Sequence, residues 1–124
     1  MKITFTGITQ EGAVQKLESA AADCRAFAAR IVSKGEAYAA LFAQEESKAD
    51  HYEAIARTIK SADSDSISIG DADMGLFSLA MARGTATFEE ADSLFKATTE
   101  SIEELPFEIM LEEGKKEAAK YESL

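Results

Sequence analysis

The chain has one cysteine, one histidine and one proline among its 124 residues, and no tryptophan. A single cysteine, Cys24, excludes an internal disulfide, agrees with a reducing compartment, and is expected to be a packed thiol. One histidine and one cysteine are too few for the usual zinc sites, which need several Cys or His ligands. We therefore expect no metal and no cofactor.

Long apolar runs are also missing. No stretch approaches the roughly 18 apolar residues of a membrane-spanning helix. The N-terminal MKITFTGIT alternates where a signal peptide would be continuously apolar. We expect a cytoplasmic protein that does not bind membranes. The length fits a single domain, residues 1–124, and a hydrophobic content of 46% argues against a disordered chain.

Catalytic motifs are absent as well. His51 stands beside Asp50, but no Gly-x-Ser-x-Gly sequence frames a nucleophilic serine, and the histidine is expected to face solvent. Gly70 and Gly75 flank residues 71–74 in a pattern that matches neither the P-loop nor the dinucleotide fingerprint. The nearby aspartates lack the EF-hand spacing. We expect a protein that is not an enzyme.

Two segments, 2–6 and 66–69, alternate between apolar and polar residues as half-buried strands do. Neither persists alone, so we expect them to pair in one small sheet. Between them, residues 11–62 form a helical pattern whose apolar phase is interrupted only by Gly35 and Glu45. Its apolar positions are Val14, Leu17, Ala21, Cys24, Ala28 and Ile31, followed by Tyr38, Phe42, Ala49, Tyr52, Ala56 and Ile59.

Gly35 leaves two architectures open. If it lies inside a helix, at a cost of ~1 kcal/mol relative to Ala, one helix of about 50 residues and ~75 Å separates the strands. The strands then pair only between antiparallel partners of a dimer. If Gly35 ends a helix in the left-handed conformation, two helices of similar length form a hairpin and bring the strands together. We favour the hairpin, and keep a coiled-coil homodimer through residues 11–62 as the alternative.

A short helix is expected directly after the second strand. Asp71 or Asp73 can cap its N-terminus, because a carboxylate at that position accepts from free backbone N–H groups. Its end is expected near Arg83, since Gly84 is a natural stop.

Two more helices complete the chain. Thr87 and Glu90 have the spacing of a capping box and begin a helix over about 88–105. Pro106 suits the first position of the last helix. The predicted fold is mainly α, a helical hairpin plus three shorter helices with a minor two-stranded β element, in the order β-α-α-β-α-α-α.

Charge is divided unevenly along the chain. The net charge is −10, and residues 1–62 hold eight basic and eight acidic residues. Residues 63–124 hold five basic and fifteen acidic residues, so the second half carries the entire net charge. Such asymmetry bears on partners rather than on fold. No basic patch interleaved with aromatic residues occurs, so we do not expect direct nucleic-acid binding.

The acidic residues gather on the expected outer face of the last two helices. On a helical wheel they lie opposite the apolar stripe, and Ile109 points outward among them. An exposed Ile within carboxylates is typical of an interface anchor, although acidic helix faces are commonly just solvated. The predicted partner-binding residues are Glu89, Asp92, Glu100, Glu103, Glu104, Glu108, Ile109 and Glu112.

We therefore interpret the chain as a small acidic protein-binding module, an inhibitor or accessory protein of the kind found in phages and mobile elements, which engages a basic surface of a partner. In its sharpest form, the carboxylates mimic phosphates and occupy the groove of a nucleic-acid-binding protein. The alternative is a self-associating assembly protein, or an oligomer that binds a small ligand between its subunits.

Overall fold

A computed structural model describes residues 2–5, 8–85, 87–98 and 107–122. Within these residues the fold class is the predicted one, mainly α with a helical hairpin, three shorter helices and a small two-stranded sheet. The elements are β1 (Lys2–Thr4), α1 (Gln10–Val32), the 3-10 turn η1 (Glu36–Tyr38), α2 (Ala39–Lys60), β2 (Ser66–Ser68), α3 (Asp71–Ala82), α4 (Phe88–Thr98) and α5 (Phe107–Glu122).

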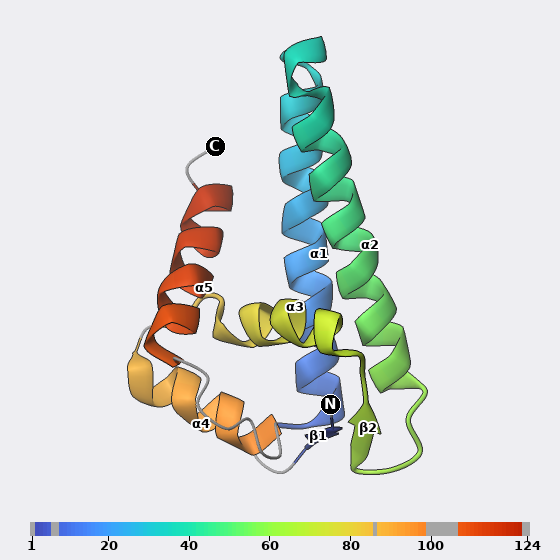
Figure 1. Ribbon diagram of the computed structural model, residues 1–124, viewed down its shortest axis with the longest axis vertical. Coiled ribbons are helices and arrows are strands. Elements are labelled where there is room, and N and C mark those ends of the chain that lie inside the picture. Colours follow the sequence, from blue (N-terminus) through green and yellow to red (C-terminus); the bar gives the residue numbers. More distant parts are fainter. Residues whose placement is uncertain (1, 6–7, 86, 99–106, 123–124) are drawn as a thin grey trace.

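Gly35 closes a hairpin between α1 and α2, which run side by side along their lengths (Figure 1). Its φ of 110° and ψ of 178° lie in a region that glycine alone adopts without strain. The helical pattern is therefore broken at Gly35 into two helices of nearly equal length, of 23 and 22 residues. The predicted hairpin is confirmed, and the alternative of one continuous helix is wrong. The predicted left-handed conformation of Gly35 at the end of a helix is also wrong, because α1 already ends at Val32 and Gly35 precedes η1 with an extended ψ.

The hairpin returns the chain to the sheet. β1 and β2 pair antiparallel within the chain, with Ile3 opposite Ile67. The N–H of Phe5 also donates to the carbonyl of Asp65, at 2.9 Å. The described strands are shorter than the predicted ones, and Ile3 is completely buried beneath the helices.

Burial along the hairpin follows the predicted apolar phase, except that Tyr38 is exposed and Phe42 is only half-buried. The hydroxyl of Thr9 caps α1 by accepting from the N–H of Gly12 at 2.9 Å, and the apolar positions of α1 are buried. On α2 the phase is buried from Ala49 onward. Tyr38, predicted to belong to the stripe, is instead 41% exposed. The prediction was wrong there because residues 32–40 at the tip of the hairpin are all exposed, so the apolar phase corresponds to no buried face in this segment.

α3 crosses the lower half of the hairpin and completes the core (Figure 1). The prediction that Asp71 or Asp73 caps this helix was wrong in detail. Gly70 is the N-cap residue, since its carbonyl already accepts from the N–H groups of Asp73 and Met74. The two aspartates lie in the first turn, where negative charge interacts favourably with the helix dipole.

α4 and α5 lie on the α1 side of the hairpin, and both contact α3 (Figure 1). The hydroxyl of Thr87 accepts from the N–H of Glu90 at 3.2 Å, which confirms that Thr87 caps α4. The continuation of this helix to residue 105, and Pro106 itself, lie outside the described residues. α5 begins at Phe107, one residue after the proline.

Candidate functional site

Three residues of the predicted partner surface lie in the first turns of α5. Glu108, Ile109 and Glu112 are all exposed there. Ile109 is 58% exposed, the largest fraction among the big apolar side chains that the structure describes. Further along the helix the charge is mixed, since Lys116 lies 3.6 Å from the carboxylate of Glu113.

The rest of the predicted surface lies on α4 or beyond it. Glu89 is exposed and Asp92 is half-buried on α4, which packs against α5. Glu100, Glu103 and Glu104 lie outside the described residues. The structure thus brings two acidic helices together, and the middle of the predicted ridge stays a prediction.

A buried cluster of charged and polar side chains joins α5 to the hairpin. Glu45 of α2 is 1% exposed and accepts from the Tyr121 hydroxyl at 2.7 Å and from the Lys120 ammonium at 2.5 Å. Glu117 of α5 is 7% exposed and lies 2.7 Å from the ammonium of Lys48. The cluster matches each buried carboxylate with a cation, which burial of charge requires.

Two tyrosines and the cysteine complete the cluster. The Tyr52 hydroxyl donates to Glu117 at 3.3 Å, and the Tyr121 hydroxyl lies 3.2 Å from the sulfur of Cys24. The Tyr121 ring meets Phe27 edge-on, with 5.5 Å between the ring centroids. Cys24 is fully buried, which confirms the expected packed thiol.

The pKa shifts in this cluster favour structure over proton transfer. Burial raises the pKa of Cys24 to about 11 and moves the pKa of Tyr52 and of Tyr121 upward. For Glu45, burial alone would raise the pKa, but hydrogen bonds from Lys120 and Tyr121 hold it below its ordinary value. All four pKa values move away from neutrality, whereas general acid or base catalysis works best with a pKa near the working pH.

Sequence reasoning missed this cluster, although one signal pointed to it. Glu45 interrupts the apolar phase of α2, and a carboxylate at a core position must find a cation when it is buried. Periodicity identifies such a position. It does not identify Lys120 and Tyr121, which are more than 70 residues away in the sequence, as the partners.

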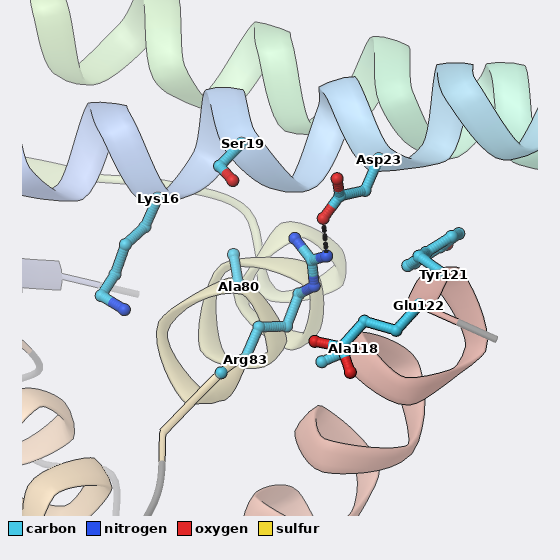
Figure 2. Close-up of a pocket in the computed structure, with 9 residues that line it drawn as sticks. Lys16, Ser19, Asp23, Ala80, Arg83, Ala118, Tyr121 and Glu122 are labelled. Carbon is cyan, nitrogen blue, oxygen red and sulfur yellow. Dashed lines mark hydrogen bonds and ion pairs between the residues drawn. The ribbon is translucent and has the colours of Figure 1, made fainter. Parts of the chain in front are cut away.

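A cavity of about 230 Å³ opens beside the cluster, between α1, the end of α3 and the last turns of α5 (Figure 2). Arg83 enters it from the end of α3, with its guanidinium hydrogen-bonded to Asp23 and 5.4 Å from the centroid of the Tyr121 ring. The Arg83 side chain is only 9% exposed. Lys16 of α1 and Glu122 of α5 line the same cavity.

A second cavity of about 430 Å³ lies along the groove between α1 and α2. Arg25 borders it and donates to Glu46 at 2.5 Å, to Asp50 at 2.7 Å and to Glu53 at 2.8 Å. The hydrogen bonds and charge of Arg25 hold the pKa of Glu53 below its ordinary value. Because Arg25 belongs to α1 and the three carboxylates belong to α2, these ion pairs link the two helices.

His51 is exposed on α2, as predicted. Among the residues that the structure describes, no three His, Cys, Asp or Glu side chains are grouped to hold a metal ion. In the same ranges, no helix combines the length and the apolar character needed to cross a bilayer. Comparison with known proteins finds no matching family model, no matching curated protein and no matching solved structure.

Proposed function

We propose that the protein is a non-enzymatic binding module that engages a basic surface of a partner protein through the acidic outer side of α4 and α5. The observation that carries this proposal is Ile109, which is 58% exposed and stands between exposed Glu108 and Glu112 along α5. Full burial of an Ile side chain contributes about 1.5 to 3 kcal/mol, and surrounding carboxylates favour encounter with a basic partner. Together they supply an anchor and a charge that selects the partner.

Internal pairing of acidic residues supports the same assignment. Glu117 is buried and neutralised by Lys48, so it contributes little to the outer field. Glu89, Glu108 and Glu112 are exposed on the surface. A first-turn acid such as Glu108 also stabilises its own helix by about 0.3 to 1 kcal/mol, so the test must separate helix stability from binding.

We expect the double variant Glu108→Gln with Glu112→Gln to weaken partner binding about tenfold, because two carboxylates beside the anchor lose their charge. The matched control removes two exposed glutamates of the neutral half, Glu11→Gln with Glu36→Gln. Tagged protein is used to capture a partner at low and high salt. The Kd is then measured with the purified partner, alongside helix content by circular dichroism.

Binding that is insensitive both to salt and to the α5 double variant would rule out the acidic surface. If the captured partner binds nucleic acid, and added DNA or RNA displaces the protein from it, the mimicry form of the proposal is supported. Equal weakening by both double variants would mean that only net charge matters, and would contradict a site on α5.

A second candidate function, self-association through the hairpin, is favoured by the hairpin tip. Residues 32–40 are all exposed, and they include Val32 at 56% and Tyr38 at 41%. Because the strands pair within one chain, a dimer is not required to complete the fold. Apolar side chains that project at the end of a hairpin nevertheless suit contact with a second copy.

Light scattering tests this second candidate. A dimer is expected for the unchanged protein, and Val32→Ser with Tyr38→Ser should convert it to a monomer, because the apolar contact is lost. Phe88→Ser is the control, since Phe88 is 40% exposed on α4, away from the tip. A monomer at high concentration would exclude self-association.

A further inference from the structure

The cavity between α1, α3 and α5 contains the guanidinium of Arg83, whose hydrogen-bond donors are not all satisfied (Figure 2). A guanidinium has five N–H donors, and within the described part of the chain Asp23 is the only hydrogen-bond acceptor for the guanidinium of Arg83. Its Nε is buried without a partner. A buried N–H group without an acceptor is destabilising, so an acceptor from outside the chain would be favoured here.

Lys16 brings a second cation to the same cavity from α1. It is half-buried, and no described carboxylate lies within ion-pair distance of it. Burial, together with the positive charge of Arg83, lowers the pKa of Lys16. An anion placed between the two cations would reverse both effects, since it would offset the lost hydration and the mutual repulsion.

Arg25 of α1 shows how this fold satisfies another guanidinium. Arg25 is surrounded by three carboxylates of α2, each within 2.8 Å. Arg83 is less exposed than Arg25, at 9% against 36%, yet it has one carboxylate instead of three. The more buried guanidinium therefore has fewer carboxylate acceptors. Stability alone would favour the opposite arrangement, because buried polar groups are normally hydrogen-bonded.

We propose that this cavity binds a small phosphate-bearing anion, which accepts hydrogen bonds from the Arg83 guanidinium and from the Lys16 ammonium. A tetrahedral phosphate presents oxygens in several directions and so serves both cations at once. A planar carboxylate offers two oxygens, which a single guanidinium occupies. The volume of about 230 Å³ holds a phosphate group but is smaller than most pockets for drug-sized ligands. The ligand is therefore inorganic phosphate or the phosphate end of a small ester.

The carboxylate of Glu122 weakens the binding of an anion at this site. It is exposed on the last turn of α5 and lines the cavity across from Lys16 (Figure 2). Its carboxylate repels an anion that enters the cavity, although solvent screens this repulsion. Removal of this charge should consequently strengthen phosphate binding, a result that loss of a merely structural contact would not produce.

The test is titration of the full chain with inorganic phosphate, followed by calorimetry and by amide NMR shifts. We expect saturable binding with shifts centred on Lys16, Arg83 and Gly84. Lys16→Gln should raise the Kd about tenfold, and Glu122→Gln should lower it about threefold. Lys60→Gln is the matched control, because Lys60 is 65% exposed and paired with Glu18 outside the cavity.

Arg83→Gln should abolish binding, but this variant also loses the ion pair with Asp23. If Arg83→Gln fails to fold, Lys16→Gln decides the question. Glycerol phosphate that binds more tightly than inorganic phosphate would identify the ligand as an ester, and equal affinity would identify the free anion. A Kd weaker than about 10 mM for the unchanged protein, equal binding by Lys16→Gln, or acetate that competes as well as phosphate would overturn the proposal. None of these outcomes depends on the acidic surface of α4 and α5.

Discussion

Replacement of Glu45 by alanine is expected to lower the free energy of unfolding by about 3 kcal/mol, which is near the low end of the range for breaking a buried ion pair. Glu45 is 1% exposed, and its loss leaves the Tyr121 hydroxyl and the Lys120 ammonium without their closest acceptor. The loss stays at the low end because the side chains of Lys120 and Lys48 are 38% and 23% exposed, so both ammonium groups can recover contact with water.

Urea unfolding of Glu45→Ala and of Glu46→Ala provides the measurement and its control. Glu46 is the next residue along α2, but its side chain is 34% exposed and it pairs with Arg25 at the surface of the hairpin. Exposed pairs contribute about 0 to 1 kcal/mol, so this variant should stay close to the unchanged protein. Equal losses for the two variants would mean that the buried cluster does not stabilise α5 against the hairpin.

The pH dependence of the Glu45 effect has a definite sign. The folded protein holds the pKa of Glu45 below its ordinary value, mainly because hydrogen bonds from Lys120 and Tyr121 outweigh burial. A carboxylate with a lowered folded pKa contributes stability above its unfolded pKa of about 4.3, and loses that contribution as pH falls through the folded value. The difference in stability between the unchanged protein and Glu45→Gln should therefore be largest near neutral pH and should shrink below about pH 4.

Substitution of Gly114 by alanine is expected to destabilise the protein by about 2 kcal/mol, although alanine is the better helix former. Gly114 is buried within α5 where this helix crosses the end of α3. A Cβ at this position would lie 2.9 Å from the Cβ of Ala82 and 3.0 Å from its backbone carbonyl atoms. Backbone atoms do not move aside like a flexible side chain, so α5 would have to shift away from α3.

Gly75 is the matched control for this substitution. It lies within α3, is exposed, and a Cβ there would meet nothing within 4 Å. Gly75→Ala should therefore show only the gain in helix propensity, and raise the free energy of unfolding by about 0.5 to 1 kcal/mol. Thermal or urea unfolding of the two variants should move in opposite directions. A gain for Gly114→Ala would contradict the close approach of α5 to α3.

The sequence predicts those parts of this fold that depend on local pattern. The period of the apolar residues locates the α1 and α2 seams, and Gly35 marks the turn because its backbone conformation is strained for any other residue. The prediction for Tyr38 was wrong because residues 32–40 at the hairpin tip are all exposed, and a periodic pattern does not show where a helix pair extends beyond the rest of the fold. Periodicity thus identifies the apolar face of a helix but not how far along the helix that face is covered.

The buried cluster and the cavity are beyond such rules for a different reason. From the sequence alone, Glu45 can be recognised as a charged residue at an apolar position of a helix, and Arg83 as the residue near which a helix ends. Their partners come from distant segments, since Cys24 and Tyr121 are separated by 97 residues and Tyr52 and Glu117 by 65. Periodicity shows which face of a helix is buried but not which helix covers it.

The closure of the hairpin by Gly35 has a consequence for the order in which the protein folds. Contacts between α1 and α2 join residues close along the chain near the turn, so they form after a small loss of chain entropy. α5 reaches its place only through contacts of long sequence separation, and we expect it to dock after the folding transition state. Destabilisation at Glu45 or Gly114 should then appear mainly as faster unfolding, with refolding rates nearly unchanged. The hairpin would act as the folding nucleus, and the docking of α5 would determine the unfolding rate of the native state.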